Sequence, residues 1–420
     1  MCRPGQAIPP ARLALAAALI ASTAAQPLDP AALLHDATDK VETAAAHLDD
    51  FACIETLQRR VYRRQDLISR PNAAVIPTTP GPHDMLIWSD QLRMEVALLH
   101  GEQLFSWPGD TAFRYRDAGE LAGGGAASAG EFGAFGISVL LSDADPMALR
   151  FRGLSDSGLA EYTYSVPRSS SHFTVESGSH EEMKAAYEGS FFIDPRTADL
   201  KRLIVRVVHP PPDSDIAAGE IVIEYGPQSL GQVTAWLPRT STMRMLNNRG
   251  DLVVNGSDYG QCRKFGAEST ISFDSSKPAS SAPQPLPADP LPFGLVLHTA
   301  IQTAIDAGRT FAGDPIEVRV LKRITRGGQV LVPAGARVSG RIVELRQVFQ
   351  PTPGVILAIR FDHIEMNGTS RPISLAALGP LGTGVPLPPR GGPERAAIIT
   401  IAGSTRLHIP AGDKWDWQTR

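Results

Sequence analysis

Residues 53–64 read CIETLQRRVYRR, and this stretch decides the fold class. Cys53, Leu57 and Val61 fall at even spacing, with charged and polar residues between them. Alternation of this kind predicts a long β-strand, because successive side chains of a strand point to opposite faces of its sheet.

The flanking residues extend this pattern into a domain. Apolar residues recur at helical spacing over residues 31–50, after a start signal at Asp29, which predicts one N-terminal helix. Short alternating segments separated by turn residues then run over 84–275, interrupted by a glycine-rich patch at 123–136. We therefore expect a mainly β (α+β) chain, with a curved antiparallel sheet and an N-terminal helix over residues 26–274.

A linker and a second domain follow. Residues 275–293 read SSKPASSAPQPLPADPLPF, a composition that cannot pack a core and is typical of a semi-extended linker. Residues 294–420 carry short strand-like segments at regular spacing, with turn signals such as Gly327-Gly328. This spacing predicts a small C-terminal β-barrel.

The first 25 residues have the three parts of a secretory signal peptide. Arg3 and Arg12 supply positive charge, an apolar run extends from Leu13 to Ala21, and small residues lead to a cleavage site near Ala25. An alanine-rich amphipathic helix is the alternative, and the lack of a polar face disfavours it. Cys2 precedes the apolar run, so no lipid anchor is expected at this signal.

Bulk properties narrow the class of protein. A net charge of −4 predicts that the chain does not bind nucleic acid, which would require a basic face. After the signal no stretch is apolar for the roughly 18 residues that a spanning helix needs. We therefore expect a periplasmic or otherwise exported protein with no transmembrane segment in the mature chain.

Two cysteines, Cys53 and Cys262, remain once the signal is removed. An even pair in an exported protein predicts a disulfide bond, with two buried free thiols as the alternative.

The C-terminal domain resembles a known family. The runs LHTAI (297–301), GDP (313–315), VLVPAGARVSG (330–340) and FDHI (361–364) look like the C-terminal β-barrel of TrbI/VirB10-type conjugation proteins. The resemblance implies a barrel in an envelope protein. Secretion-channel members carry an apolar helical insertion, and residues 345–400 hold no such run, so a pore is not implied.

The N-terminal domain resembles the LolA/LolB/RseB-type lipoprotein-handling fold. The order of helix, long strand and hairpins agrees, and FIDPRTADLKRL (192–203) is the most similar run. The resemblance implies a curved sheet around an apolar cavity. Seven candidate lining residues are Trp88, Met94, Phe105, Trp107, Phe132, Phe135 and Leu140, with an ordinary filled core as the favoured alternative.

Catalytic motifs are absent from the sequence: it has no H-E-x-x-H, no G-x-S-x-G and no Walker loop. His172 and His180 are the only close histidine pair of the sheet region, and they fit strand edges better than a metal site. Glycines 123–125 fit a loop better than a phosphate cradle. Asp143 and Asp145 fit helix capping better than acid–base chemistry. We therefore assign no catalytic residue, no metal and no cofactor.

Two further patterns have competing interpretations. Arg59, Arg60, Arg63 and Arg64 form a basic strand that fits either contact with anionic lipid headgroups or, preferably, a solvated face. Asn255-Gly256-Ser257 and Asn367-Gly368-Thr369 match glycosylation sequons but are expected to form hairpin turns.

Together these patterns predict a non-catalytic envelope protein that binds a lipid, a lipoprotein or an envelope partner. The first alternative is a structural or docking component of a cell-envelope assembly. An exported hydrolase is the second alternative, and no nucleophile–base constellation in the sequence supports it.

Overall fold

The computed structural model describes residues 28–46, 51–64, 76, 79–99, 102–110, 112–113, 115–116, 118–121, 125–128, 130–145, 148–176, 182–230, 233–264, 291–378 and 396–420. The chain is mainly β and its sheets are antiparallel, which confirms the predicted fold class. The predicted signal peptide and most of the predicted linker lie outside the described residues, and the domain limits stay a prediction.

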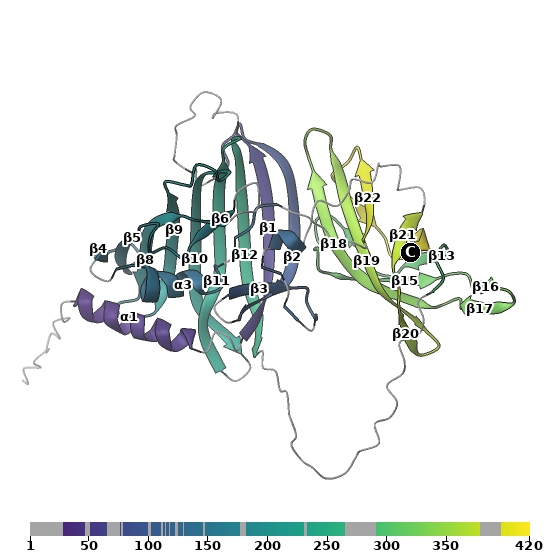
Figure 1. Ribbon diagram of the computed structural model, residues 1–420, viewed down its shortest axis with the longest axis horizontal. Helices are drawn as coiled ribbons and strands as arrows, with labels where there is room; N and C mark the ends of the chain where they lie inside the picture. The colour runs from purple at the N-terminus through teal and green to yellow at the C-terminus, as the bar shows by residue number, and fades with distance from the viewer. Residues whose placement is uncertain are drawn as a thin grey trace, which may run out of the picture.

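The N-terminal unit, residues 28–264, holds ten strands of the main sheet. Their bounds are β1 Phe51–Arg63, β2 Met85–Leu99, β3 Glu102–Ser106, β4 Arg150–Leu154, β5 Ala160–Val166, β8 Ala186–Ile193, β9 Leu200–Val208, β10 Ile216–Leu230, β11 Val233–Asn247 and β12 Asp251–Lys264. They pair in the spatial order β4, β5, β8, β9, β10, β11, β12, β1, β2, β3 (Figure 1).

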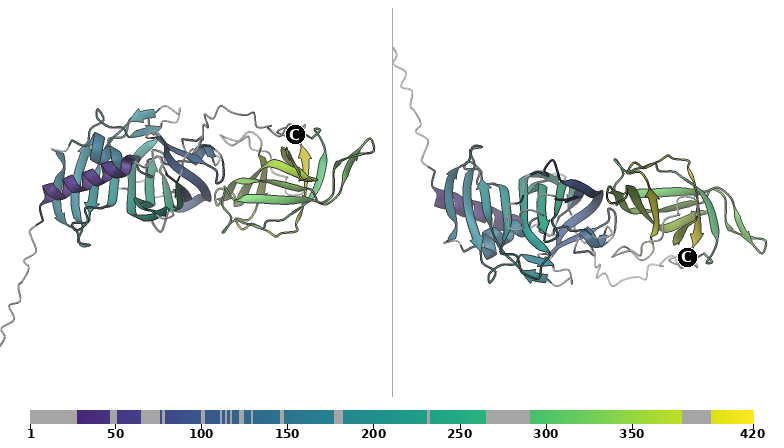
Figure 2. Two further views of the ribbon diagram at one scale, coloured as in Figure 1. Left: turned by 90° about the horizontal axis from the view of Figure 1, so that it is seen from below. Right: turned by 90° about the horizontal axis from the view of Figure 1, so that it is seen from above.

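Smaller elements complete this unit. They are the hairpin β6 Thr174–Glu176 with β7 Glu182–Lys184, the helices α1 Pro30–Ala45, α2 Ala118–Leu121 and α3 Ala134–Ile137, and the π-helical turn η3 Ser138–Asp143. Figure 2 shows α1 lying across the strands of the sheet.

Helix α1 begins where the sequence places its start signal. The Asp29 side chain accepts hydrogen bonds from the backbone N–H groups of Ala31 and Ala32, at 3.0 and 3.2 Å. Leu33 and Ala37 are buried on the sheet side of the helix. The hydroxyl of Tyr162 donates to the Pro30 carbonyl at 2.8 Å, which fixes the N-terminal end of the helix on β5.

The opening stretch of the sequence forms β1, at the centre of the unit. β12 pairs along one edge of β1 and β2 along the other. Cys53, Leu57 and Val61 are buried on one face as predicted, and Glu55 and Arg59 are buried on that same face. Two ionisable side chains therefore lie inside the unit, where each needs hydrogen bonds or an opposite charge to offset the loss of water.

A disulfide joins Cys53 on β1 to Cys262 on β12, as predicted. The two residues are 209 apart in the sequence. The bond therefore connects the first strand of the sheet to the last strand before the predicted linker.

The C-terminal unit, residues 291–420, holds the remaining strands. Their bounds are β13 Val296–Ile301, β14 Ile305–Asp306, β15 Pro315–Val320, β16 Ile324–Arg326, β17 Gln329–Val332, β18 Arg337–Val348, β19 Gly354–Met366, β20 Thr369–Pro372, β21 Leu375–Leu378, β22 Ala397–Ala402, β23 His408–Ile409 and β24 Lys414–Thr419. One continuous apolar cluster fills this unit, with Trp417 fully buried in it.

The ladder of the C-terminal unit runs β21, β24, β13, β15, β18, β19, and β19 then pairs with both β20 and β22. No pairing among the described strands joins β21 to β22. The predicted small closed barrel is therefore not confirmed, and the described strands form an open, curved ladder.

The two units share one sheet, because both continue from β2. The outer edge of β2 pairs with β3 over Glu95–Leu99 and with β18 over Trp88–Asp90. Between these stretches the backbone of Arg93 donates to the Ala312 carbonyl at 2.7 Å. A side chain at Gly313 would place its Cβ only 2.0 Å from the Arg93 carbonyl oxygen, so only glycine fits this crossing.

A charged cluster lies at this junction. The guanidinium of Arg59, fully buried, makes two hydrogen bonds to Asp90, at 2.8 and 2.6 Å. Arg346 of β18 reaches the same carboxylate at 3.2 Å. Trp88 packs beneath both cations, 5.5 Å from the Arg59 guanidinium carbon and 4.4 Å from that of Arg346.

The basic strand is thus not one solvated face. Arg59 is inside the protein, Arg63 pairs with Asp251 and Arg64 lies 3.8 Å from Asp84, whereas Arg60 is exposed. Burial of Arg59 and pairing of its neighbours count against a continuous lipid-binding row on β1.

Removal of the disulfide tests its contribution to stability. We expect Cys53→Ala/Cys262→Ala to lower the free energy of unfolding by about 2–5 kcal/mol, because the bond restricts the unfolded chain. Urea unfolding of the oxidised protein and the variant measures this difference. An unfolding midpoint that does not change would contradict it.

Removal of the shared carboxylate tests the junction. Asp90→Ala leaves the Arg59 charge buried without its carboxylate, and we expect a loss of about 3–5 kcal/mol in unfolding free energy. Glu365→Ala is the control, because it breaks an exposed pair with Arg337 and is expected to cost less than about 1 kcal/mol. Equal losses in the two variants would show that the junction is not stabilised in this way.

Candidate functional site

An apolar groove of about 80 Å³ lies between α1 and the sheet. Val41 and Ala44 of the helix form one wall, and the facing wall comes from β9, β11 and the α3 turn. The full lining is Lys40, Val41, Ala44, Gly133, Ile137, Asp199, Leu200, Tyr225, Trp236, Leu237 and Pro238. Most of these side chains are apolar, so the groove favours an apolar ligand group.

Charged residues lie at the rim of the groove. The ammonium of Lys40 donates to Asp199 at 2.8 Å, and Lys201 lies 3.6 Å from the same carboxylate. These cations hold the pKa of Asp199 below its ordinary value, although burial alone would raise it. Lys201 also lies 4.0 Å from the ring centroid of Trp236, whose indole N–H donates to the Leu200 carbonyl at 2.6 Å. The rim therefore has a fixed geometry with both signs of charge.

Tyr225 forms the polar part of the groove wall. Its hydroxyl is buried and has no hydrogen-bond partner among the described residues. Burial, together with the nearby carboxyl of Glu131, raises the pKa of this phenol, so it stays neutral and can donate. A Cβ at Gly136 would lie 2.9 Å from this hydroxyl, so the glycine makes room for it.

A buried polar cluster lies behind the groove, on the concave face of β1 and β12. Ser257 donates to one oxygen of Glu55 at 2.5 Å, and the other oxygen has no partner in the described part of the chain. Burial raises the pKa of Glu55 to about 8, and the neighbouring Glu131 adds to this shift. Burial raises the pKa of Glu131 to about 7. Both carboxyls are therefore largely protonated in mildly acidic conditions.

The glycine-rich segment covers this cluster. Gln103 on β3 accepts hydrogen bonds from the backbone N–H groups of Gly130 and Phe132, both at 2.9 Å. Asn255 donates to the Ala126 carbonyl at 2.9 Å, and its own side-chain oxygen has no partner within the described ranges. Side-chain types alone do not reveal this cover, because it depends on contacts between segments that are distant in the sequence.

The predicted hairpin turn at Asn255 is wrong. Asn255 lies inside β12, opposite Arg59, and alternate positions Val253, Asn255 and Ser257 of this strand are buried. The turn at Asn367-Gly368 is confirmed between β19 and β20, and both residues have positive φ.

The seven predicted cavity residues lie in two core clusters. Trp88, Phe135 and Leu140 belong to one cluster, and Met94, Phe105, Trp107 and Phe132 belong to the other. None of the seven lines the groove. The sequence did not predict the residues that line the groove. One wall comes from α1, and only the packing of this helix on the sheet brings Val41 and Ala44 close to Trp236.

Asp143 accepts several hydrogen bonds rather than capping a helix. The backbone and ring of His172 donate at 2.8 and 2.5 Å, and Tyr187 donates at 2.8 Å. Burial raises the pKa of Asp143, but these bonds outweigh it and hold the pKa below its ordinary value. No serine, threonine or cysteine side chain of the described residues is hydrogen-bonded to the His172 ring.

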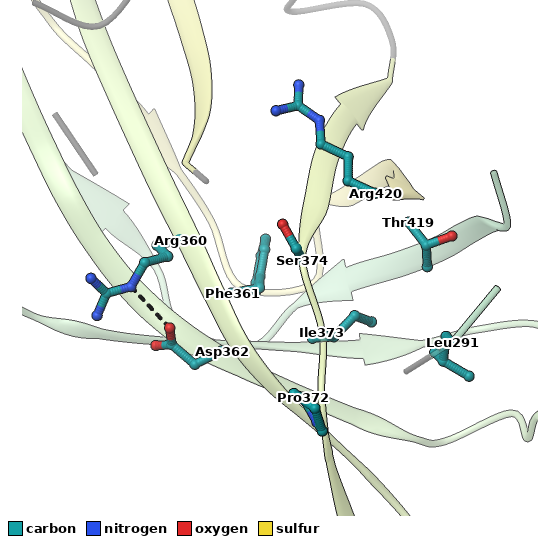
Figure 3. Close-up of a pocket in the computed structure, with 9 residues that line it drawn as sticks. All are labelled: Leu291, Arg360, Phe361, Asp362, Pro372, Ile373, Ser374, Thr419 and Arg420. Atoms are coloured by element: carbon teal, nitrogen blue, oxygen red, sulfur yellow. Dashed lines mark hydrogen bonds and ion pairs between the residues drawn. The ribbon is translucent and has the colours of Figure 1, made fainter. Parts of the chain in front are cut away.

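A larger cavity, of about 300 Å³, lies in the C-terminal unit (Figure 3). β19 pairs with β22 up to Ile359 and with β20 from His363, and the cavity forms between these two stretches. Its lining is Leu291, Arg360, Phe361, Asp362, Pro372, Ile373, Ser374, Thr419 and Arg420. Arg360 donates to Asp362 at 2.9 Å, so this charge is already paired.

Within the described ranges no group of three or more His, Cys, Asp or Glu side chains is placed to hold a metal ion.

Comparison with known proteins gives little further information. No family model matches the chain, and no curated protein matches it. The chain is similar to a solved DUF1329 family protein from Desulfovibrio piger, with 12% identity, a TM-score of 0.26, and coverage of 58% of this chain and 97% of that chain. A likeness this low supports no conclusion about fold or function, and the two family resemblances stay predictions.

The protonation of Glu55 predicts a pH dependence of stability. The folded state keeps this proton up to about pH 8, whereas an ordinary glutamate loses it near 4.5, so stability falls as pH rises between these values. Glu55→Gln cannot ionise. We expect it to exceed the wild type in unfolding free energy by about 1–4 kcal/mol at pH 8, and to differ little at pH 4.5.

Urea unfolding of both proteins across this pH range measures the difference. Glu365→Gln, at an exposed position, is the control for loss of a carboxylate. A difference between Glu55→Gln and wild type that stays constant from pH 4.5 to 8 would contradict the raised pKa.

Proposed function

We propose that this chain is an exported, non-catalytic envelope protein that binds the apolar end of a lipid-type ligand in the groove under α1. The observation that carries the proposal is the groove itself, with apolar walls, a charged rim and a buried tyrosine hydroxyl without a partner among the described residues. Amphipathic ligands suit such a site, since one end is apolar and the other can contact the charged rim.

The size of the groove limits the ligand. About 80 Å³ accommodates a few methylene groups, not a whole acyl chain. The remainder of the ligand then lies along the rim, near Lys40 and Asp199. A free fatty acid, a phospholipid and the acyl chain of a lipoprotein share this chemistry.

Export is supported by the disulfide, because such bonds persist in oxidising compartments. No helix among the described residues is both long and apolar enough to cross a membrane. These two observations agree with the N-terminal signal pattern.

A structural or docking role in an envelope assembly is the second candidate. The continuous sheet favours it, because pairing of β2 with β18 holds the C-terminal unit in a fixed orientation on the N-terminal unit. A rigid arrangement of this kind suits a scaffold that presents one unit to a partner.

Filling the groove tests the binding function. We expect Ala44→Trp to weaken binding of a fluorescent fatty acid by at least about tenfold, because the indole occupies the space of the apolar end. The control is Ala32→Trp, at an exposed position of the same helix, and it should bind like the wild type. Fluorescence titration gives the affinities, and native mass spectrometry of the purified protein shows any bound lipid.

Two results would count against this function. One is equal affinity of Ala44→Trp and wild type for the fatty acid. The other is the absence of binding in the wild type, which would favour the assembly role instead.

A further inference from the structure

The hairpin of β16 and β17 extends away from the body of the C-terminal unit in all three views (Figures 1 and 2). Every residue from Leu321 to Val330 is exposed except Ile324, which is half-buried. The two strands pair only with each other, and Gly327 and Gly328 form the turn with positive φ. A two-stranded hairpin without a packed face adds little to fold stability, so its surface is available for binding.

The base of the hairpin is firmly held. The Val320 N–H donates to the Ala336 carbonyl at 2.9 Å, and the Gly335 N–H donates to the Val320 carbonyl at 2.7 Å. Val320 and Val332 are buried in the C-terminal core. The hairpin is therefore a fixed projection with an anchored base.

The charge of this region is strongly one-sided. Residues 318–343 contain six arginine or lysine residues and no acidic residue, in a chain whose net charge is −4. Arg337 pairs with Glu365, and Arg341 donates to the Gly313 and Pro108 carbonyls. Lys322, Arg323 and Arg326 form no ion pair with any described residue, and all three are exposed.

Apolar side chains lie beside these cations. Leu321 is 42% exposed and Val330 is 49% exposed. Cations interleaved with exposed apolar residues match the interface of an anionic bilayer, where headgroups attract the charges and the acyl boundary accepts the apolar side chains.

We propose that the β16–β17 hairpin, with Lys322, Arg323, Arg326, Leu321 and Val330, docks the protein on an anionic membrane surface. The charge complementarity selects anionic phospholipid headgroups. Exposed leucine and valine favour a bilayer over a purely polar polyanion, because only the bilayer offers an apolar layer beneath the charges. This docking does not depend on the groove, which lies in the other unit.

Vesicle co-sedimentation of the full chain tests the docking. We expect binding to mixed phosphatidylglycerol–phosphatidylcholine vesicles, none to phosphatidylcholine alone, and weaker binding at high salt. Lys322→Glu/Arg323→Glu/Arg326→Glu should weaken binding by on the order of 100-fold, since each basic residue near an anionic surface contributes roughly fivefold. Because all three residues are exposed, the thermal unfolding midpoint should not change.

The matched control makes the same change of charge elsewhere. Lys184→Glu/Arg168→Glu/Arg249→Glu alters three exposed cations of the N-terminal unit and should keep most of the binding. Leu321→Ser/Val330→Ser tests the apolar part: it should weaken vesicle binding and leave binding to soluble heparin unchanged.

Several outcomes would overturn the proposal. These are no binding to anionic vesicles, equal loss in the hairpin and control variants, or a Leu321→Ser/Val330→Ser variant that binds vesicles like the wild type. The last result with retained heparin binding would indicate a soluble polyanion as the partner. Ala44→Trp should still bind vesicles, so failure of the groove and failure of the hairpin are distinguishable.

Discussion

The buried guanidinium of Arg59 is the constraint on which both units depend. A charge removed from water needs an opposite charge and hydrogen bonds, and Asp90 of β2 supplies both. This requirement fixes the register of β1 against β2, because a shift by one residue would turn Arg59 to the other face. The same carboxylate accepts from Arg346, so the C-terminal unit adds a second cation to the cluster, and Glu344 lies 3.5 Å from that guanidinium.

The concave face of the sheet divides into two zones around this pair. Under α1 the face is apolar and ends at Tyr225, whereas β1 and β12 carry Glu55, Ser257 and Asn255. Glycines allow the covering segment to approach closely: a Cβ at Gly125 would lie 3.0 Å from the Arg59 guanidinium. The interior thus differs along its length, with a small apolar groove under α1 and carboxyls of raised pKa on the neighbouring strands.

Local features of the fold could be predicted from the sequence. The strand at residues 53–64, the helix with its Asp29 cap and the Cys53–Cys262 bond depend on nearby patterning or on simple pairing of cysteines. The burial of Glu55 and Arg59 could also have been predicted, because both occupy the same face of the strand as Cys53, Leu57 and Val61. Their charge indicated exposure to solvent, but the alternation of the strand predicted their burial better than the residue type did.

Nonlocal contacts could not be predicted in the same way. The groove requires α1 to cross β9 and β11, and no spacing within α1 specifies which strands it meets. The junction of β2 with β18 joins residues about 250 positions apart in the sequence. The predicted linker at residues 275–293 lies between them, and its composition is typical of a segment that separates two domains. A proline-rich linker predicts independent modules, but backbone pairing between them depends on shape and charge that only the folded units possess.

The covered outer edge of β2 limits how the chain can be cut into separately folding fragments. Strand edges with unpaired N–H and C=O groups are templates for aggregation, and here β3, the Ala312 loop and β18 together occupy that edge. Each unit thus covers part of a strand edge of the other. Removal of the C-terminal unit would leave the backbone groups of Trp88–Asp90 on this edge unpaired, so a fragment that ends before residue 291 is expected to self-associate more than the full chain.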